Sequence, residues 1–160
     1  MPGLNFCPVT LYFTRPWAGS FAVRSAGRAL ACLIGSPTHV TVAIGGVAFV
    51  VAPGKRGCFQ AQQAFYQLSA ELRGGVVDIV TVNVPDRKAA MDAAYTYAVG
   101  PMTCRRAAWR FVTGKACDLD VDCVLAATKV LRAGGLDVPV FRTPKGLLKW
   151  LRQRPLACKS

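Results

Sequence analysis

The sequence predicts an α+β protein in which a small antiparallel sheet is packed by helices. Two runs of β-branched residues, His39–Ile44 and Val47–Ala52, are separated only by two glycines, which is a strong hairpin signal. The expected elements follow the order strand, helix, hairpin, helix, strand and then helices, and this order favours an α+β class over regular βαβ alternation. The length of 160 residues corresponds to one domain, so residues 1–160 are expected to form a single unit.

Around the hairpin, the first half of the chain supplies one more strand and two helices. Val9–Thr14 is β-rich and lies between two prolines, so it is expected to be the first strand. Phe21–Leu33 is rich in alanine and is expected to be a helix. Ala61–Leu72 carries large apolar residues at three- and four-residue spacing, which predicts an amphipathic helix. Those apolar residues are Phe65, Leu68 and Leu72.

The second half begins with Val76–Val84, whose near-continuous apolar character predicts a strand buried on both faces. Asp86 is a good N-cap for a helix that Gly100 would end. Cys123–Ala133 is expected to be a helix, which the two following glycines stop. Thr143-Pro144 has the residue types of an N-cap and a first helical position, so a last helix with a basic outer face is expected there.

The chain is strongly basic, with 20 Lys and Arg against 8 Asp and Glu and a net charge of +12. Such a surface favours polyanions, which include nucleic acids, anionic lipid and the acidic polymers of bacterial envelopes. No recognition-helix pattern or aromatic–basic interleaving accompanies the charge, and the Gly54–Gly57 turn lacks the Lys-Ser/Thr ending of a P-loop. Nucleic-acid binding therefore rests on charge alone and is not the expected function.

The longest aliphatic runs fall short of the roughly 18 residues that a membrane-spanning helix needs, so no membrane span is expected. The N-terminus has no basic region followed by an apolar stretch, and therefore no secretory signal is expected. We expect a protein that is made in the cytoplasm, with lysis or a virus particle as its way out if it leaves the cell.

The residues best suited to catalysis or metal binding are seven cysteines and a single histidine. No Cys-x-x-Cys pair occurs and one histidine cannot complete a familiar zinc set, so neither a metal nor another cofactor is expected. Most of the cysteines are expected to be small buried residues in a reducing compartment, and at least one could be a reactive thiol. The cysteines are Cys7, Cys32, Cys58, Cys104, Cys117, Cys123 and Cys158.

His39 and Cys123 form the candidate catalytic pair. His39 begins an expected strand, and Cys123 lies at the first turn of an expected helix, whose N-terminal end favours a thiolate and lowers the thiol pKa. A thiolate beside an imidazole is the minimal covalent catalyst for acyl transfer. The alternatives are a structural or solvated histidine and a cysteine that only packs, and residue spacing alone does not choose between them.

Several short motifs occur in a specific order between about Val9 and Leu151. Leu11–Arg15, an Ala-rich helix and Ser36–Ile44 come first, and Asp122–Leu136, which ends in Ala-Gly-Gly-Leu, comes much later. Gly100-Pro-Met lies upstream of that segment, and Thr143-Pro144 follows it. In this order they resemble the circularly permuted NlpC-type papain-like hydrolases, which include YiiX-like proteins and many phage-encoded relatives.

The resemblance implies a permuted papain-like fold and a thiol hydrolase with Cys123 as nucleophile and His39 as base. It implies an acyl substrate cleaved at an amide bond, with peptidoglycan stem peptides as the first candidate. From the phage-encoded relatives it also implies a place in a virion or tail, beside other virion proteins.

Three departures from the family pattern support an alternative function. Relatives usually carry a polar residue on the strand after the histidine, whereas Phe49–Ala52 is apolar, with Val51 near the expected place. Thr103 or a neighbour replaces the family's tyrosine, and Val124 replaces the serine that often follows the cysteine. A backbone carbonyl, Asp78 or Asn83 could orient His39 instead. The alternative is a catalytically weakened or inactive structural or interaction subunit of a phage particle.

Overall fold

The computed structural model describes residues 7–15, 37, 39–51, 58–72, 75–98 and 123–154. These ranges contain the strands β1 (Cys7–Thr14), β2 (His39–Ile44), β3 (Val47–Val51), β4 (Cys58–Gln62) and β5 (Val76–Val84). They also contain the helices α2 (Gln63–Leu72), α3 (Arg87–Ala98), α5 (Cys123–Ala133) and α6 (Pro144–Gln153). The expected α+β class is confirmed. The expected helix over 21–33 and the expected helix end at Gly100 lie outside the described residues.

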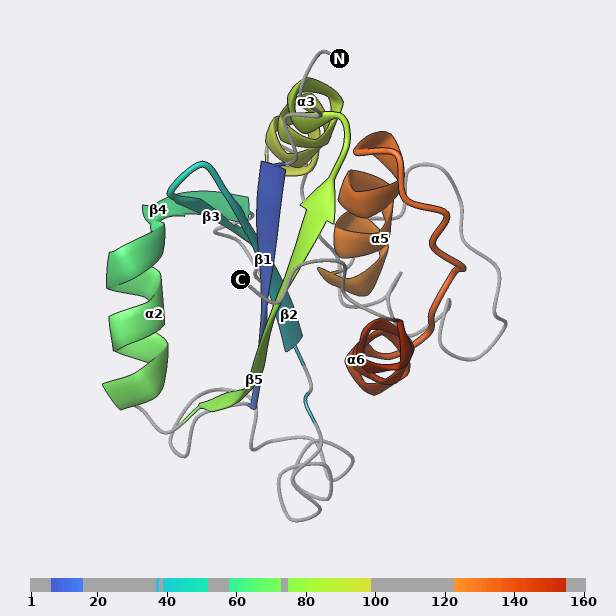
Figure 1. The fold of residues 1–160 in the computed structure, drawn as a ribbon. Coiled ribbons are helices and arrows are strands. Elements are labelled where there is room, and N and C mark those ends of the chain that lie inside the picture. Colours follow the sequence, from blue (N-terminus) through green and yellow to red (C-terminus); the bar gives the residue numbers. More distant parts are fainter. Residues whose placement is uncertain are drawn as a thin grey trace.

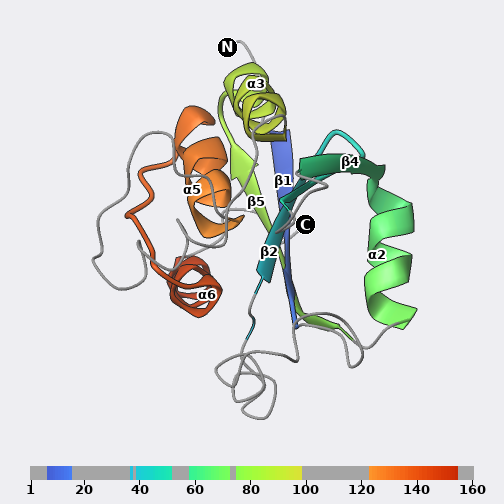
Figure 2. The same cartoon turned by 180° about the vertical axis from the view of Figure 1, so that it is seen from behind.

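The five strands form one antiparallel sheet in the order β4-β3-β2-β1-β5 (Figure 1). Helices α3, α5 and α6 lie on one side of the sheet, and α2 lies on the other (Figures 1 and 2). The main core is formed between the sheet and helices α3, α5 and α6. A smaller cluster of Tyr12, Ala43 and Ala48 packs against Tyr66 of α2. None of the helices within the described ranges is long and apolar enough to cross a membrane.

The β2–β3 hairpin is confirmed. Gly45 and Gly46 have φ angles of +59° and +84°, the conformation that a two-residue turn of type I′ requires and that glycine adopts at low cost. β2 has the expected bounds, and β3 is described from Val47 to Val51, whereas Ala52 lies outside the described residues. The local turn chemistry therefore sets the register of both strands.

Strand β4 was not expected from the sequence. Its residues pair with β3 from Val47↔Gln62 to Val51↔Cys58, and the backbone N–H of Gln63 then donates to the carbonyl of Gly46 at 2.8 Å. The short segment contains two glutamines and no β-branched residue, so its composition does not suggest a strand. As a consequence, the following helix begins at Gln63 and not at Ala61.

The prediction that β5 is buried on both faces is wrong. Val80, Val82 and Val84 are buried in the main core, whereas Ile79 is 37% exposed and Thr81 is exposed as well. β5 is an edge strand of the sheet, and α2 lies towards the opposite edge (Figure 2). The outer face of β5 therefore remains in contact with solvent.

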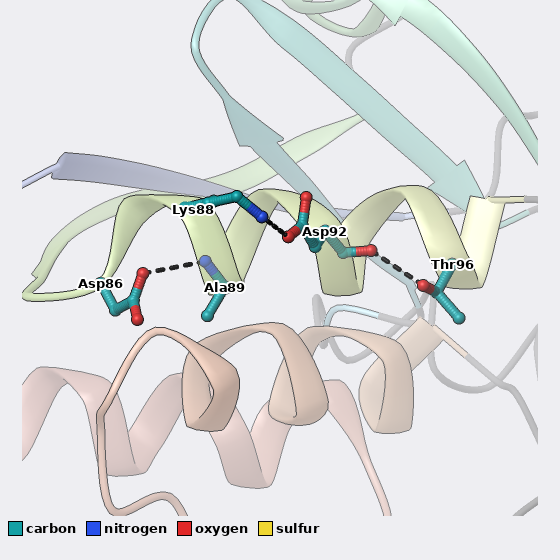
Figure 3. Close-up of polar contacts among 5 residues, drawn as sticks. All are labelled: Asp86, Lys88, Ala89, Asp92 and Thr96. Carbon is teal, nitrogen blue, oxygen red and sulfur yellow. Dashed lines mark hydrogen bonds and ion pairs between the residues drawn. The ribbon is translucent and has the colours of Figure 1, made fainter.

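Helix α3 begins with the expected cap. The carboxylate of Asp86 accepts a hydrogen bond from the backbone N–H of Ala89 at 2.9 Å (Figure 3). One turn later, Lys88 and Asp92 form an exposed ion pair with a distance of 2.6 Å between Nζ and Oδ2. The same helix thus presents one carboxylate that caps its end and one that only pairs on its surface.

Replacing Asp86 with alanine is expected to lower the free energy of unfolding by about 1 kcal/mol, because the N-terminal N–H groups of α3 lose their acceptor. Urea unfolding followed by circular dichroism measures this loss. The control is Asp92→Ala, which removes an exposed ion pair and is expected to cost at most about 0.5 kcal/mol. Equal losses in the two variants would contradict a capping role for Asp86.

Helix α5 ends against the turn that joins β5 to α3. Gly135 has a φ of +95°, and the N–H of Leu136 donates to the carbonyl of Leu131 at 3.0 Å, which closes the helix end. A Cβ at Gly134 would lie 2.8 Å from Cβ of Val84. The N–H of Asp86 also donates to the carbonyl of Gly134 at 3.0 Å, so this end of α5 is held in close contact with its neighbours.

Helix α6 has the expected cap and the expected basic outer face. The hydroxyl of Thr143 accepts from the backbone N–H of Gly146 at 3.2 Å, and Pro144 is the first helical residue. The buried residues are Leu147, Leu148 and Leu151, and the exposed ones include Lys145, Lys149 and Arg152.

Candidate functional site

His39 is the first residue of β2 and is half-buried. Val40, Val42 and Ile44 of the same strand lie in the main core, whereas Ala43 belongs to the cluster under α2. Because side chains alternate along a strand, His39 is assigned to the α2 face together with Thr41 and Ala43. Its cross-strand partner on β1 is Thr14.

Among the described residues, only β1 pairs with the His39 end of β2. β1 pairs with the whole of β2, whereas β3 pairs with it only from Val42 to Ile44. Beyond this point β3 continues with β4, as far as the pair Val51↔Cys58. The His39 end of β2 therefore has a paired strand on the β1 side but none among the described residues on the other, and groups from the two sheet faces can approach each other around this edge.

Cys123 is the first residue of α5, as expected, and it is a thiol outside any disulfide, with 9% exposure. It lies in the main core, in the same cluster as Val40 and Val42 of β2. Helix α5 packs against β2 and β3. The structure therefore places the two candidate residues at the starts of two elements in contact, one on each face of the sheet, with Cys123 where helix N–H groups are left without intrahelical partners.

A group of hydroxyls surrounds the His39 position on the α2 face. Tyr66 of α2 donates its hydroxyl to Oγ1 of Thr41 at 2.9 Å, and a side-chain hydrogen bond also joins it to Thr14. Thr14 is the cross-strand partner of His39, and Thr41 follows it by two residues on the same face. Tyr66 also interacts electrostatically with Cys123, which lies in the main core on the opposite face of the sheet.

Burial raises the pKa of Tyr66 above its ordinary value of 10.0. Its hydrogen bonds to Thr41 and Thr14 act in the opposite direction, and interactions with Tyr12 and Cys123 add to the rise. Tyr66 is therefore a neutral phenol at physiological pH, and it can donate a hydrogen bond on the sheet face that carries His39.

We expect the free energy of unfolding to fall as pH rises above 10.0, because the unfolded state then loses the Tyr66 proton before the folded state does. In Tyr66→Phe this loss should become smaller, although the variant is less stable at neutral pH. Urea unfolding at neutral and alkaline pH measures the difference. The matched control is Tyr12→Phe, which removes the neighbouring phenol and leaves Tyr66 in place. An unchanged pH dependence in Tyr66→Phe would contradict this expectation.

Neither of the two side chains considered from the sequence is placed to orient His39. Asp78 lies on β5. Strand β1 lies between β5 and β2, so these two strands are two spacings of about 4.8 Å apart. Oδ2 of Asp78 accepts hydrogen bonds from Arg152 of α6, with Nη2 at 2.6 Å. Asn83 pairs with Pro8, about 20 Å along β1 from the Thr14↔His39 pair. The polar side chains on the sheet face of His39 are instead those of Thr14, Thr41 and Tyr66.

Sequence reasoning missed Tyr66, because an aromatic residue among apolar neighbours on a helix usually packs in a core. A usable signal does exist on the same helix. A polar stripe lies opposite the apolar residues of α2 and consists of Gln63, Tyr66 and Gln67, at positions i, i+3 and i+4. Such a stripe indicates a helix that makes hydrogen bonds to the structure beneath it.

Within the described ranges, no group of three or more His, Cys, Asp or Glu side chains is arranged to hold a metal ion. In comparisons with known proteins, the chain matches no family model, no curated protein and no solved structure.

Proposed function

We propose that this protein is a thiol hydrolase that cleaves amide bonds, with Cys123 as nucleophile and His39 as base. One observation carries the proposal. The first residue of β2 is the only histidine of the chain, the first residue of α5 is a buried thiol, and these two elements pack together. The neutral phenol of Tyr66 supports it, because this side chain is bonded to Thr41 of the strand that carries His39 and interacts electrostatically with Cys123.

In the proposed reaction His39 takes the proton from Sγ of Cys123, and the thiolate attacks the carbonyl carbon of the amide. The backbone N–H of Cys123 supplies one donor to the oxyanion that forms. Breakdown of this intermediate breaks the C–N bond, and the leaving amine takes the proton from His39. A water molecule, deprotonated by His39, then hydrolyses the thioester, which releases the acid and restores the thiol.

The substrate class follows from the resemblance and from charge. The NlpC-type relatives suggested by the motif order favour peptidoglycan stem peptides. A chain with a net charge of +12 is suited to the anionic wall that holds these peptides. In this proposal the protein acts as a component of a phage virion or tail.

Labelling with a thiol-reactive probe, with mass-spectrometric assignment of the modified cysteines, tests the pair. Cys7 is a matched internal reference, because it is also a free buried thiol, with 5% exposure, on a strand with no histidine. We expect Cys123 to react faster than Cys7, and we expect His39→Ala to remove that advantage. Equal rates for the two thiols, or no effect of His39→Ala, would refute an activated pair.

The burial of Cys123 favours a second candidate function, a subunit that keeps this fold without catalysis. A nucleophile with 9% exposure needs the surrounding structure to open before a peptide reaches it. In that case the protein would serve as a structural or interaction component of a phage particle. Equal labelling of Cys7 and Cys123 in a folded protein is the result expected for this alternative.

A further inference from the structure

Helix α2 turns its apolar side outwards. Phe65 is 67% exposed, Leu68 is 55% exposed and Leu72 is 79% exposed. These three residues, called the α2 stripe below, lie at positions i, i+3 and i+7 and so share one side of the helix. An amphipathic helix normally buries such a stripe against the core, so the orientation of α2 needs a cause.

The cause is a set of hydrogen bonds on the inner side of the helix. The amide of Gln63 donates to the hydroxyl of Tyr12 at 2.9 Å, and that hydroxyl donates to Oε1 of Gln67 at 3.0 Å. Tyr66 donates to Thr41 of β2, and its ring packs edge-on against Tyr12 with 5.4 Å between centroids. Rotating the helix to bury its apolar side would break these bonds, so its orientation is fixed.

We propose that the α2 stripe is a docking surface for a second copy of this chain, in a two-fold symmetric dimer. A two-fold contact places the same patch on both partners, and an apolar stripe is complementary to itself. Two such helices can approach to about 8–10 Å, at which distance the leucine and phenylalanine side chains interdigitate. The proposal is independent of the hydrolase function, because the stripe lies on the side of α2 that faces away from His39.

The distribution of charge favours a second copy as the occupant. Helix α2 contains no cation, and its single charged residue is Glu71, whose Oε1 accepts from Gln67 at 2.8 Å. Of the ten lysines and arginines in the described ranges, nine lie on or beside α3, α5 and α6, across the sheet from α2 (Figure 1). These nine are Arg87, Lys88, Lys129, Arg132, Arg142, Lys145, Lys149, Arg152 and Arg154.

A dimer through α2 therefore keeps these nine cations of one copy far from the same nine of the other. Several layers of about 10 Å each separate them, whereas charge repulsion is screened over about 8 Å at physiological salt. An anionic membrane would instead require the apolar stripe and the cations on the same side. The contact is centred on one short helix, so we expect a weak and concentration-dependent dimer.

Sedimentation velocity of the full chain under reducing conditions, over a wide range of concentration, tests the dimer. We expect the average mass to rise from monomer towards dimer with concentration, and to change little with salt, because the cationic faces of the two copies lie more than a screening length apart. The double variant Leu68→Gln, Leu72→Gln should weaken the dimer by about tenfold or more, because two buried leucines are lost on each side.

The matched control is Val140→Gln, which makes the same change in polarity at a residue that is 50% exposed and lies between α5 and α6. It should dimerise as the unmodified protein does. A protein that stays monomeric at every concentration, or a dimer that the double variant leaves unchanged, overturns the proposal. So does a monomer whose binding to anionic vesicles depends on Leu68 and Leu72.

Discussion

Replacing Cys123 with alanine is expected to lower amide hydrolysis by about a thousandfold or more, because the reaction loses the atom that forms the acyl-enzyme. The fold should survive, since the change removes one sulfur atom at the start of α5 and leaves every backbone hydrogen bond in place. Hydrolysis of a peptidoglycan stem peptide measures the activity, and circular dichroism with urea unfolding measures the fold.

Cys7→Ala is the matched control for this experiment. Cys7 is also a free buried thiol of the main core, but it lies at the start of β1, at the opposite end of that strand from the Thr14↔His39 pair. Its activity should equal that of the unmodified protein. Activity that persists in Cys123→Ala would exclude the proposed nucleophile, and activity lost in both variants would indicate damage to the core and not to the chemistry.

Leu131→Ala is expected to lower the free energy of unfolding by about 2–5 kcal/mol. Leu131 lies on α5, is 0% exposed and belongs to the main core that joins the helices to the sheet. The substitution removes apolar contacts and leaves a cavity that the closely packed end of α5 cannot readily fill. Urea unfolding followed by circular dichroism gives the size of the loss.

Leu72→Ala makes the same chemical change on α2, where the side chain is 79% exposed. At protein concentrations low enough to keep the chain monomeric, it should alter the free energy of unfolding by no more than about 0.5 kcal/mol. A large loss in Leu72→Ala, or a small one in Leu131→Ala, would contradict the assignment of α5 to the core and of the α2 stripe to the surface.

The sequence was informative wherever one local signal decides a structure. Two glycines define the β2–β3 hairpin, a second glycine pair ends α5, and Thr143 caps α6. The bounds of β5 and α5 agree with the predicted ones for the same reason. Each signal acts through the conformation or hydrogen bonding of a few neighbouring residues, so no knowledge of the tertiary structure was needed.

Other features depend on contacts between distant parts of the chain. The exposure of one face of β5 follows from its place at the edge of the sheet, which the apolar sequence of the strand does not reveal. The orientation of α2 depends on Tyr12 and Thr41, more than twenty residues away. In the candidate site, the elements that carry His39 and Cys123 were predicted. The contribution of Tyr66 was not, because its hydrogen-bond partners Thr14 and Thr41 come together only when β1 and β2 pair.

The tight packing at the C-terminal end of α5 has a consequence for Cys123 at its other end. The helix has 11 residues and is about 16 Å long, so it moves as a stiff rod. A side chain at Gly134 or Gly135 would meet Val84 or Pro85 at less than 3 Å and push that end away from the turn. Because the helix is stiff, moving its C-terminal end would also shift Cys123 at its N-terminal end. The position of the Cys123 sulfur therefore depends on Gly134 and Gly135, which lie at the far end of the helix.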